Sequence, residues 1–476
     1  MRKGKVSISA VKLWRRFLKQ NRRKKKIRER RSGFYRHIKN VIKKAKQKGN
    51  LDYSVPKYKP FGSNYSFQSK RQPVLSDDIR FLAERPEAFD GSAMRLPEGG
   101  IFLVPKVFSL TANPNESFLF LKRLFVAFYK DIFSIITLDY DQCETLDIDA
   151  QMCLDIVLSE FLEYYKTCGR RKIKTTFQRF EPRNFTKSAI GKILFSIGTF
   201  ENIGRNRVTL PDIVPFHLIR GDNFRHTAGA EREVETTKMV DYIVERYAEM
   251  NRTLTWQALN RLSKVIGEIL GNAGEHSQRQ YRYAIGYFEK TKVKDVEHGI
   301  FNFAILSFGT TIYETFKQRE SEGWHIISTM KELSEKYTKR LFFLKGSFEE
   351  ETLWTLYALQ EGVTSVPEKK RGNGSINFIE SFFSLKGDMA NDNSSFLAIM
   401  SGNTRITFNG EYQIVEKSRG EGEEPFKMMT FNASGNIEDK PDSKYVTFAD
   451  NFFPGTLITA KICINFNNIE NNGSHG

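Results

Sequence analysis

The chain has 476 residues, of which 40% are hydrophobic and 13% aromatic. This composition excludes an intrinsically disordered protein, and the length predicts roughly two or three folded domains because it is too great for one ordinary core. The net charge is +18, but residues 1–50 hold 21 lysine and arginine residues against one acid, a net charge of +20, so the other 426 residues carry a net −2. The sequence therefore predicts a nearly neutral folded body that follows a basic arm.

The cysteines and the apolar segments indicate the compartment. The four cysteines form no Cys-x-x-Cys pair, and no secretory leader is evident, so we expect reduced thiols in a cytoplasmic protein. No apolar run approaches the ~20 residues needed to cross a bilayer, so no transmembrane segment is expected. No spacing of His, Cys and Asp residues predicts a zinc site.

The basic arm, residues 1–50, is expected to be helical because residues 6–20 and 33–49 have apolar residues at helical spacing. Clustered cations bind RNA or DNA by releasing phosphate counterions, and aromatic residues among them can stack on bases. An anionic membrane surface and a solvated tail are the alternatives. The residues expected to contact nucleic acid are Arg22, Arg23, Lys24, Lys25, Lys26, Arg28, Arg30 and Arg31.

Residues 51–98 predict a linker or an extended segment because they are rich in proline, serine, glycine and tyrosine. Their aromatic residues indicate that part of the segment docks on the folded body. Residues 99–224 predict a smaller α/β domain. Its strands are expected near 101–105, 134–142 and 212–221, and its helices near 117–130, 149–166 and 188–198.

One strand-turn-helix unit in this domain has a familiar pattern. The strand that contains Leu138-Asp139-Tyr140 leads through a short acidic turn into a long amphipathic helix. This order resembles STAS-type domains, the fold of anti-sigma-factor antagonists. Phosphorylatable members of that family carry Ser or Thr where the helix starts, and Thr145 is the only candidate in this turn. The favoured alternative is an ordinary α/β accessory domain in which Thr145 is a turn residue.

Two helices are expected next. Residues 226–251 predict a charged connecting helix, and residues 256–277 predict an amphipathic helix with apolar residues every three or four positions. Gly271 and Gly274 interrupt the second helix. Glycine lowers helix stability, so another group is expected to approach closely there.

The polar face of the helix at 256–277 needs a functional explanation. Glu268 and Asn272 lie one turn apart on the same face, and Glu275 and His276 continue the polar run at the helix end. A lone histidine in this position is more often a structural cap or a phosphate neighbour than a phosphoacceptor.

Downstream blocks add phosphate-binding features. Strands are predicted at 282–290 and 299–309, and the second ends in Ser307-Phe308-Gly309. A charged, helix-rich insertion at about 313–371 leads into Lys369-Lys370-Arg371-Gly372-Asn373-Gly374-Ser375, which precedes an apolar helix. Glycines before a helix offer backbone N–H groups and a positive dipole end to phosphates, and the cations strengthen that field.

The C-terminal part predicts the closing strands of a sheet at 394–402, 404–410 and 453–458, the last of which contains Thr456. Taken together, the run from Glu268 to His276 and the later blocks resemble the GHKL ATPases, which include gyrase B subunits, MutL, histidine kinases and anti-sigma-factor kinases. The resemblance covers residues 225–467. It implies a Bergerat-type α/β sandwich, with the insertion as its nucleotide lid, within an α/β (α+β) chain.

The resemblance also implies roles for single residues. Glu268 matches the catalytic carboxylate that activates water, and Asn272 matches the amide that gives an oxygen to Mg²⁺. Ser307 stands where the family usually has the aspartate that receives the adenine amino group, which leaves base selectivity open. Gly271 and Gly274 would leave room for a triphosphate. The residues expected to bind ATP are Asn272, Glu275, His276, Ser307, Gly309, Lys370, Arg371, Gly372, Gly374, Ser375 and Thr456.

Three functions are compatible with these patterns. The first is an ATP-hydrolysing molecular switch whose basic arm binds nucleic acid. The second is a protein serine/threonine kinase or regulator that acts on a STAS-type partner, as anti-sigma-factor kinases do. The third is a non-catalytic nucleotide-binding scaffold, which the departure at Ser307 favours. GHKL proteins often act as dimers, but no feature of this sequence defines an interface.

Overall fold

The computed structural model describes residues 76–85, 96–130, 135–167, 180–185, 188–197, 210, 212–293, 296–338, 348–363, 374–387, 395–418 and 425–471. The chain divides into a unit of residues 1–70 and a unit of residues 71–476, and all described residues belong to the second. The basic arm at 1–50 therefore lies outside the described residues. The described part is a mixed α/β fold, as predicted.

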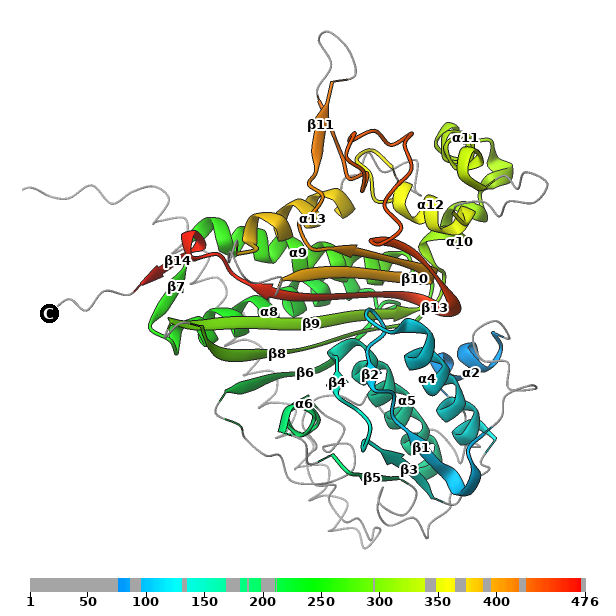
Figure 1. Ribbon diagram of the computed structural model, residues 1–476, viewed down its shortest axis with the longest axis vertical. Coiled ribbons are helices and arrows are strands. Elements are labelled where there is room, and N and C mark those ends of the chain that lie inside the picture. Colours follow the sequence, from blue (N-terminus) through cyan, green and yellow to red (C-terminus); the bar gives the residue numbers. More distant parts are fainter. Residues whose placement is uncertain are drawn as a thin grey trace, which may run out of the picture. The chain divides into compact units, whose positions relative to one another are not determined.

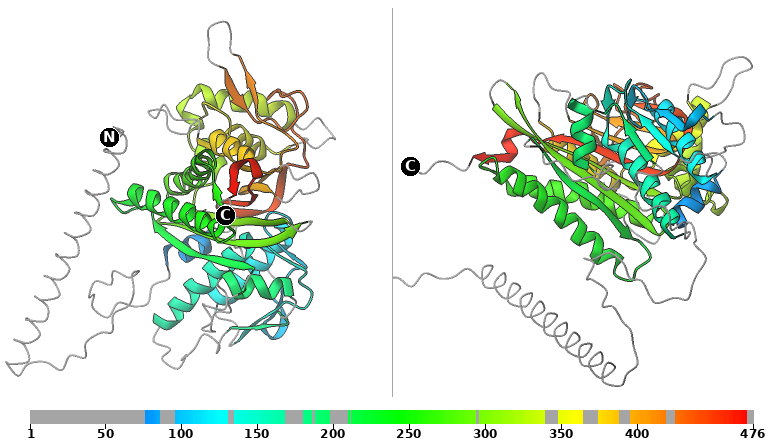
Figure 2. Two further views of the ribbon diagram at one scale, coloured as in Figure 1. Left: turned by 90° about the vertical axis from the view of Figure 1, so that its left-hand side faces the viewer. Right: turned by 90° about the horizontal axis from the view of Figure 1, so that it is seen from below.

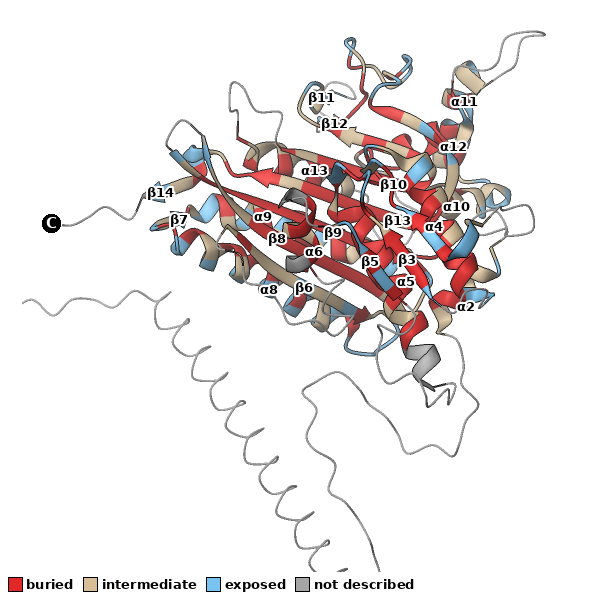
Figure 3. Ribbon diagram, turned by 60° about the horizontal axis from the view of Figure 1, so that its bottom comes forward, coloured by how far each residue is buried: buried red, intermediate tan, exposed pale blue. Residues whose placement is uncertain are grey.

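A five-stranded antiparallel sheet forms the centre of this unit, with the strand order β10-β13-β9-β8-β6 (Figure 1). Both faces of the sheet are covered, since every residue of β9 from His298 to Phe308 is buried although successive side chains point to opposite faces. Figure 3 shows most of the sheet in the colour of buried residues. The strands are β6 (Ile213–Asp222), β8 (Tyr281–Val293), β9 (Val296–Phe308), β10 (Phe396–Phe408) and β13 (Val446–Cys463).

Three helices cover one face of the sheet. They are α8 (Ala228–Ala248), α9 (Trp256–Glu275) and α13 (Gly374–Leu385). Figure 2 shows α8, in green, running along the long strands. Phe288, Phe303 and Ile305 point from the strands into the same core as the apolar stripe of α9. Helix α9 begins at the predicted place because the Thr255 hydroxyl accepts a hydrogen bond from the Ala258 N–H (3.2 Å) and so caps its first turn.

The opposite face is covered by helices from the segment at 99–224. These are α4 (Pro114–Tyr129), α5 (Ile148–Thr167) and α6 (Ser188–Ile197). Tyr283, Leu306 and Leu457 point into this second core, where Phe125 and Phe161 pack edge to face. The same segment carries a small parallel sheet of β1 (Ile101–Leu103), β3 (Ile136–Asp139) and β5 (Phe180–Arg183), and the short pair β2 (Val107–Phe108) and β4 (Thr145–Leu146), with η1 (Glu98–Gly100) before them. The sheet thus separates two helical layers.

Strand β6 differs from its sequence-based assignment. The sequence pattern places it at the end of the 99–224 domain, whereas its backbone pairs with β8 and makes it the edge strand of the five-stranded sheet. Local pattern identifies the strand itself, but its partner lies far along the chain. Tyr242 on α8 strengthens this attachment, since its hydroxyl donates a hydrogen bond to the Val214 carbonyl.

The insertion predicted at about 313–371 is helical where the structure describes it. It contains α10 (Ile312–Lys317), η3 (Glu320–Glu322), α11 (His325–Thr338) and α12 (Glu350–Tyr357). Helix α10 begins with a capping box, because the Thr311 hydroxyl accepts from the Glu314 N–H and the Glu314 carboxylate accepts from the Thr311 N–H. Thr311 is therefore the N-cap residue of α10.

The C-terminal strands also depart from the prediction in one respect. The strands expected at 394–402 and 404–410 are one strand, β10, whose register shifts around Gly402, where φ is +59°. Such an irregularity bends a strand without ending it. The remaining elements are β7 (Arg252–Leu254), β11 (Val415–Lys417), β12 (Phe426–Met428), η4 (Phe466–Asn468) and β14 (Ile469–Asn471).

Part of the segment predicted as a linker packs on the body as helix α2 (Asp77–Ala83). Ile79 and Leu82 are buried in the core with α4 and α5. The Tyr283 hydroxyl donates to the Asp78 carboxylate (2.5 Å), and Arg279 donates to the Asp77 carbonyl (2.8 Å). Helix α2 is thus anchored by both apolar and polar contacts.

Two further expectations concern the membrane and the thiols. None of the helices in the described ranges is long and apolar enough to span a membrane. No disulfide joins the described cysteines, Cys143, Cys153 and Cys463, which are all buried, while Cys168 lies outside the described residues.

The anchor of α2 predicts a pH dependence. Burial raises the pKa of Asp78 to about 6, against the usual value of 3.8. The folded protein therefore holds this proton more tightly than the unfolded chain does. The resulting contribution of protonated Asp78 to the free energy of unfolding is full below about pH 4 and is lost as the pH rises through 6. Asp78→Asn, which stays neutral, should unfold in urea like the parent at pH 4 and be more stable by about 3 kcal/mol at pH 7. Asp77→Asn on the exposed side of α2 is the control, and a pH-independent difference for Asp78→Asn would contradict the assignment.

Candidate functional site

A pocket lies between helices α9 and α13 and the face of the central sheet that they cover. Its volume of about 130 Å³ is close to that of an apolar cavity of ~150 Å³ that holds benzene, so it accommodates a ring-sized group. Residues of α10 and of the segment after α12 complete the wall. Six residues singled out from the sequence line this pocket: Asn272, His276, Ser307, Gly374, Ser375 and Thr456. The fold thus brings four separate sequence blocks to one place.

Two rows of side chains across three adjacent strands form the floor of the pocket, and one member, Ser401, is fully buried behind the lining residues. Ser307 on β9 is the register partner of Thr456 on β13, and Thr456 is the partner of Ser401 on β10. The second row, two residues away on each strand, is formed by Ile305, Ile458 and Ile399. A row of hydroxyls therefore borders an apolar bed, which suits a flat ring with polar groups on one edge.

Glu268 and Asn272 lie one turn apart on α9. Asn272 is half-buried and lines the pocket, whereas Glu268 is exposed and does not line it. The Oε2 atom of Glu268 lies 2.7 Å from the position that a Cβ atom on residue 374 would take, so glycine at 374 allows this carboxylate to lie against the start of α13. Within the described part of the chain, neither the Glu268 carboxylate nor the Asn272 side-chain amide makes a hydrogen bond.

The end of α9 separates the two residues that follow. His276 is the C-terminal cap residue, its N–H donates to the Asn272 carbonyl (3.2 Å), and it lines the pocket. Glu275 points elsewhere, because its carboxylate pairs with Arg232 of α8 at 3.2 Å on the exposed surface. Successive side chains on a helix are rotated by about 100° from one another, which explains why neighbours in sequence separate here.

The close approach expected at the glycines of α9 occurs at Gly274 but not at Gly271. A Cβ on Gly274 would lie 2.7 Å from the Arg232 guanidinium and 3.2 Å from the Asn223 side chain, so this glycine allows α8 and the β6–α8 turn to approach. The contacts at Gly274 are thus those of a helix-packing glycine. A Cβ on Gly271 would meet no atom within 4 Å in the described structure.

Gly309 shapes the wall of the pocket without lining it. Its φ is +128°, and a Cβ there would lie 1.9 Å from the Ser277 carbonyl oxygen, so only glycine fits. The next residue, Thr310, donates its N–H to the same carbonyl at 3.1 Å and does line the pocket.

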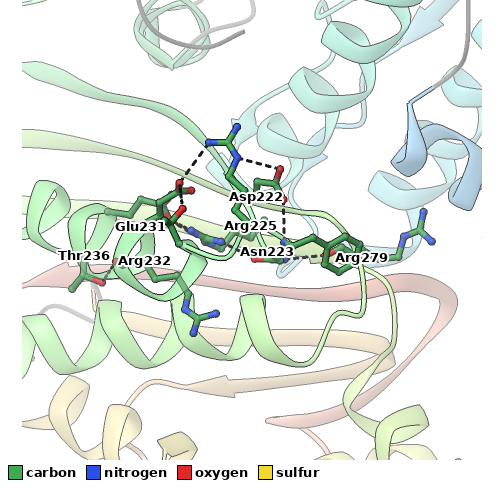
Figure 4. A network of polar contacts seen from close by, with 11 residues as sticks. Asp222, Asn223, Arg225, Glu231, Arg232, Thr236 and Arg279 are labelled. Carbon is green, nitrogen blue, oxygen red and sulfur yellow. Dashed lines mark hydrogen bonds and ion pairs between the residues drawn. The ribbon is translucent and has the colours of Figure 1, made fainter. Parts of the chain in front are cut away.

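A polar network holds the turn after α9 in place (Figure 4). The Asn223 amide donates to the Ser277 hydroxyl (3.4 Å) and to the Arg279 carbonyl (3.1 Å), while its oxygen accepts from Arg282 (2.7 Å). Arg282 also pairs with Glu235 at 2.8 Å, and the two side chains are only 1% and 9% exposed. A buried pair of this kind fixes geometry, since loss of one partner leaves an uncompensated charge.

Sequence reasoning missed much of the wall. The missed residues that line the pocket include Ile269, Ala273, Ser277, Ile305, Thr310, Ile312, Thr315, Phe316, Ala358, Leu359, Val363, Phe378, Ile399 and Ile458. Strand alternation could have identified Ile305 and Ile458, because they lie two residues from Ser307 and Thr456 on the same face. No local sequence pattern identifies Ala358 or Leu359 as pocket residues, because they reach the pocket only through the packing of α12.

Some expected residues lie outside the described part of the chain. Lys370, Arg371 and Gly372 are among them, as are the eight cations from Arg22 to Arg31. Within the described ranges, no group of three or more His, Cys, Asp and Glu side chains could hold a metal ion. An ion at Asn272 would therefore need most of its oxygen ligands from a bound molecule and water.

Comparison with known proteins gave no match. No family model matches the chain, and searches of curated proteins and of solved structures found no significant similarity. What the pocket binds must therefore be argued from its residues.

Two of the three glycines of α9, Gly271 and Gly274, give a matched test of the site geometry. Gly271→Ala should raise the free energy of unfolding by roughly 0.5–1 kcal/mol, because alanine favours the helix and the new methyl group meets open space. Gly274→Ala should lose this gain because Arg232 and Asn223 must move. Urea denaturation of both variants checks the order, and equal stabilisation by the two changes would contradict the packing described.

Proposed function

We propose that the pocket binds ATP and that the chain is an ATP-hydrolysing molecular switch of the GHKL type. The observation that carries the proposal is the convergence of Asn272, His276, Ser307, Ser375 and Thr456, predicted as nucleotide contacts from separate blocks, on one ring-sized pocket. The mixed α/β fold and the helix pair α9 and α13 over an antiparallel sheet agree with the expected sandwich.

The pocket suggests how the nucleotide would lie. The base would rest on Ile305, Ile458 and Ile399 with its polar edge toward the hydroxyl row. The phosphates would then lie near Gly374 and Ser375, where the first backbone N–H groups of α13 and the positive end of its dipole favour negative charge. Helix α13 has 12 residues, enough for a substantial dipole.

The residues of α9 supply the chemistry. Asn272 fits Mg²⁺ because its side-chain amide faces the pocket and makes no hydrogen bond to described residues, and oxygen ligands are those that Mg²⁺ prefers. When bound, the ion would neutralise phosphate charge. Glu268, one turn away and next to Gly374, would accept the proton of the attacking water.

We propose the insertion after β9 as the lid of the site. Thr315 and Phe316 of α10 and Ala358 and Leu359 after α12 line the pocket, so a ligand contacts this insertion as well as the sheet. Closure of such an insertion excludes water and couples the bound nucleotide to shape.

The base assignment is tested with Glu268→Gln. The variant should bind ATP in the presence of Mg²⁺ about as well as the parent but hydrolyse it roughly 10²–10⁴ times more slowly, because the amide cannot accept the proton. Calorimetric binding and release of inorganic phosphate measure the two effects. Glu275→Gln, which changes a carboxylate paired with Arg232 outside the pocket, is the matched control.

The same assays separate the alternatives. Unchanged turnover in Glu268→Gln would remove the base assignment. Transfer of labelled phosphate to a protein would indicate the kinase, whereas binding without hydrolysis by the parent would indicate the scaffold. Absence of ATP binding by the parent would overturn the proposed function.

We further propose that the basic arm binds nucleic acid, with an anionic membrane as the competing surface. The support is the charge pattern, since residues 1–50 carry a net +20 while the rest of the chain carries −2. Phosphate contacts of this kind are strong at low salt and independent of sequence.

Removal of residues 1–50 tests the arm. The full chain should shift both DNA and RNA in a gel at low salt, and the truncated chain should not. Replacing the eight cations from Arg22 to Arg31 with glutamine should lower the salt slope by about 0.9 for each phosphate of duplex DNA that the arm no longer neutralises. Replacing Lys331 and Lys336 on α11 with glutamine is the control. Equal shifts with and without the arm would contradict the proposal, as would binding only to anionic vesicles.

A further inference from the structure

Helix α2 contacts two elements that form the wall of the pocket. Its buried side chains, Ile79 and Leu82, lie in the core with α4 and α5. Its polar contacts run elsewhere, to the turn after α9 and to helix α10, and both of these contribute residues to the pocket. None of the residues of α2 lines the pocket itself, so any influence of this helix on a ligand acts through the wall.

The first contact is made by Arg279 in the turn after α9. Its guanidinium donates to the Asp77 carbonyl (2.8 Å) and lies over the ring of Phe81, 4.6 Å from the ring centre. The backbone of Arg279 holds the turn, because its N–H donates to the Ser277 hydroxyl (3.3 Å). Ser277 lines the pocket, and its carbonyl accepts from the N–H of Thr310, which also lines it. Arg279 thus connects α2 to this part of the wall.

The second contact is an ion pair with the first helix of the insertion. Arg85, which follows α2, donates to the Glu314 carboxylate at 2.7 Å, and the two side chains are 22% and 26% exposed. The other oxygen of this carboxylate accepts from the Thr311 N–H (2.9 Å) and so closes the capping box of α10. Thr315 and Phe316 of the same helix line the pocket. The ion pair therefore holds the helix that supplies this part of the wall.

The two contacts share one aromatic ring. Phe81 of α2 has the Arg279 guanidinium at 4.6 Å and the Arg85 guanidinium at 5.5 Å from its ring centre. Arg85 also lies over Phe452 of β13 at 4.9 Å. Attraction between a cation and the face of an aromatic ring stabilises these positions. Movement of α2 away from the body would therefore break both contacts with the wall together.

Loss of the ion pair would affect a ligand through the position of α10. A ligand that contacts Thr315 and Phe316 needs both residues in place, and a wall that is held less firmly must be ordered when the ligand binds. The apparent dissociation constant then rises in inverse proportion to the fraction of molecules in which the wall is already formed. The pair is partly exposed, so water screens it and the effect is moderate.

We propose that α2 is a clamp that holds the pocket wall in its ligand-binding form, with Arg85 as a positioning residue that acts through Glu314 and α10. This inference depends on the proposed nucleotide-binding function for its ligand and adds a regulatory element outside the pocket. Release of α2 would weaken nucleotide binding without any change in the lining residues. Coupling between two sites is reciprocal, so a bound nucleotide should also hold α2 more firmly on the body.

Calorimetric titration of the full chain with ATP and Mg²⁺ tests the clamp. Arg85→Gln should weaken binding about fivefold, the lower end of typical coupling, because the pair is partly exposed. Glu314→Gln removes the charge but keeps an acceptor for the capping box, so it should weaken binding equally. The double variant should bind no more weakly than either single variant, since all three lack the same pair. Arg80→Gln, which loses only an exposed pair with Asp77 on α2, is the matched control and should bind like the parent.

Hydrogen exchange measured by mass spectrometry tests the reciprocal effect. The N–H groups of Arg80 and Glu84 donate to the carbonyls of Ser76 and Arg80 at 3.0 and 2.9 Å, so their exchange reports the opening of α2. ATP with Mg²⁺ should slow this exchange in the parent about fivefold and have little effect in Arg85→Gln. Additive losses of affinity in the double variant, an equal loss in Arg80→Gln, or exchange of α2 that ATP leaves unchanged would each overturn the inference and leave the nucleotide site intact.

Exchange without nucleotide separates this inference from the proposed function. The Thr315 N–H donates to the Thr311 carbonyl (3.0 Å) in the first turn of α10. Its exchange should be faster in Arg85→Gln than in the parent, whereas Arg80→Gln should leave it unchanged. Unchanged exchange of α10 in Arg85→Gln would overturn the clamp whatever the parent binds. Absence of ATP binding by the parent would overturn the proposed function, while faster exchange in Arg85→Gln would still support the clamp on the wall.

Discussion

The antiparallel ladder that joins β9, β13 and β10 sets the position of each polar group on the pocket floor. Its register places Ser307 opposite Thr456 and Thr456 opposite Ser401. Side chains alternate between the two faces of a strand, so a slip of one residue would exchange these hydroxyls for Leu306 or Leu457. Both faces of the sheet are buried, which makes such a slip costly and keeps the hydroxyls in line.

The segment at 99–224 is more closely tied to the C-terminal half than its sequence suggests. Its helices α4, α5 and α6 pack on the second face of the same sheet whose first face carries α8, α9 and α13. Strand β6 continues this sheet, and Arg85, just after helix α2, pairs with Glu314 of α10 at 2.7 Å. One sheet therefore serves two helical layers.

The sequence allowed prediction of the features that depend on local periodicity and chemistry. The boundaries of α9, the strands β8 and β9 and the polar residues Asn272 and Ser307 follow from such patterns, and the structure agrees in placing both residues at the pocket. Glu275 points away from the pocket because it pairs with Arg232, and position 274 needs glycine because Arg232 and Asn223 approach it. Strand β6 joins the central sheet by pairing with β8. All of these partners are distant in sequence. Single-sequence periodicity carries no information about such partners, so these features required coordinates.

The alternation along the three strands has a consequence for how the chain can change over generations. Each hydroxyl of the floor has a neighbour in its own strand that faces the other helical layer, namely Phe308, Leu457 and Met400. Close-packed interiors transmit changes of volume, so a larger or smaller side chain in that far layer moves the backbone that carries Ser307, Thr456 and Ser401. Substitutions among these far-layer residues therefore alter the pocket floor, although none of the three lines the pocket.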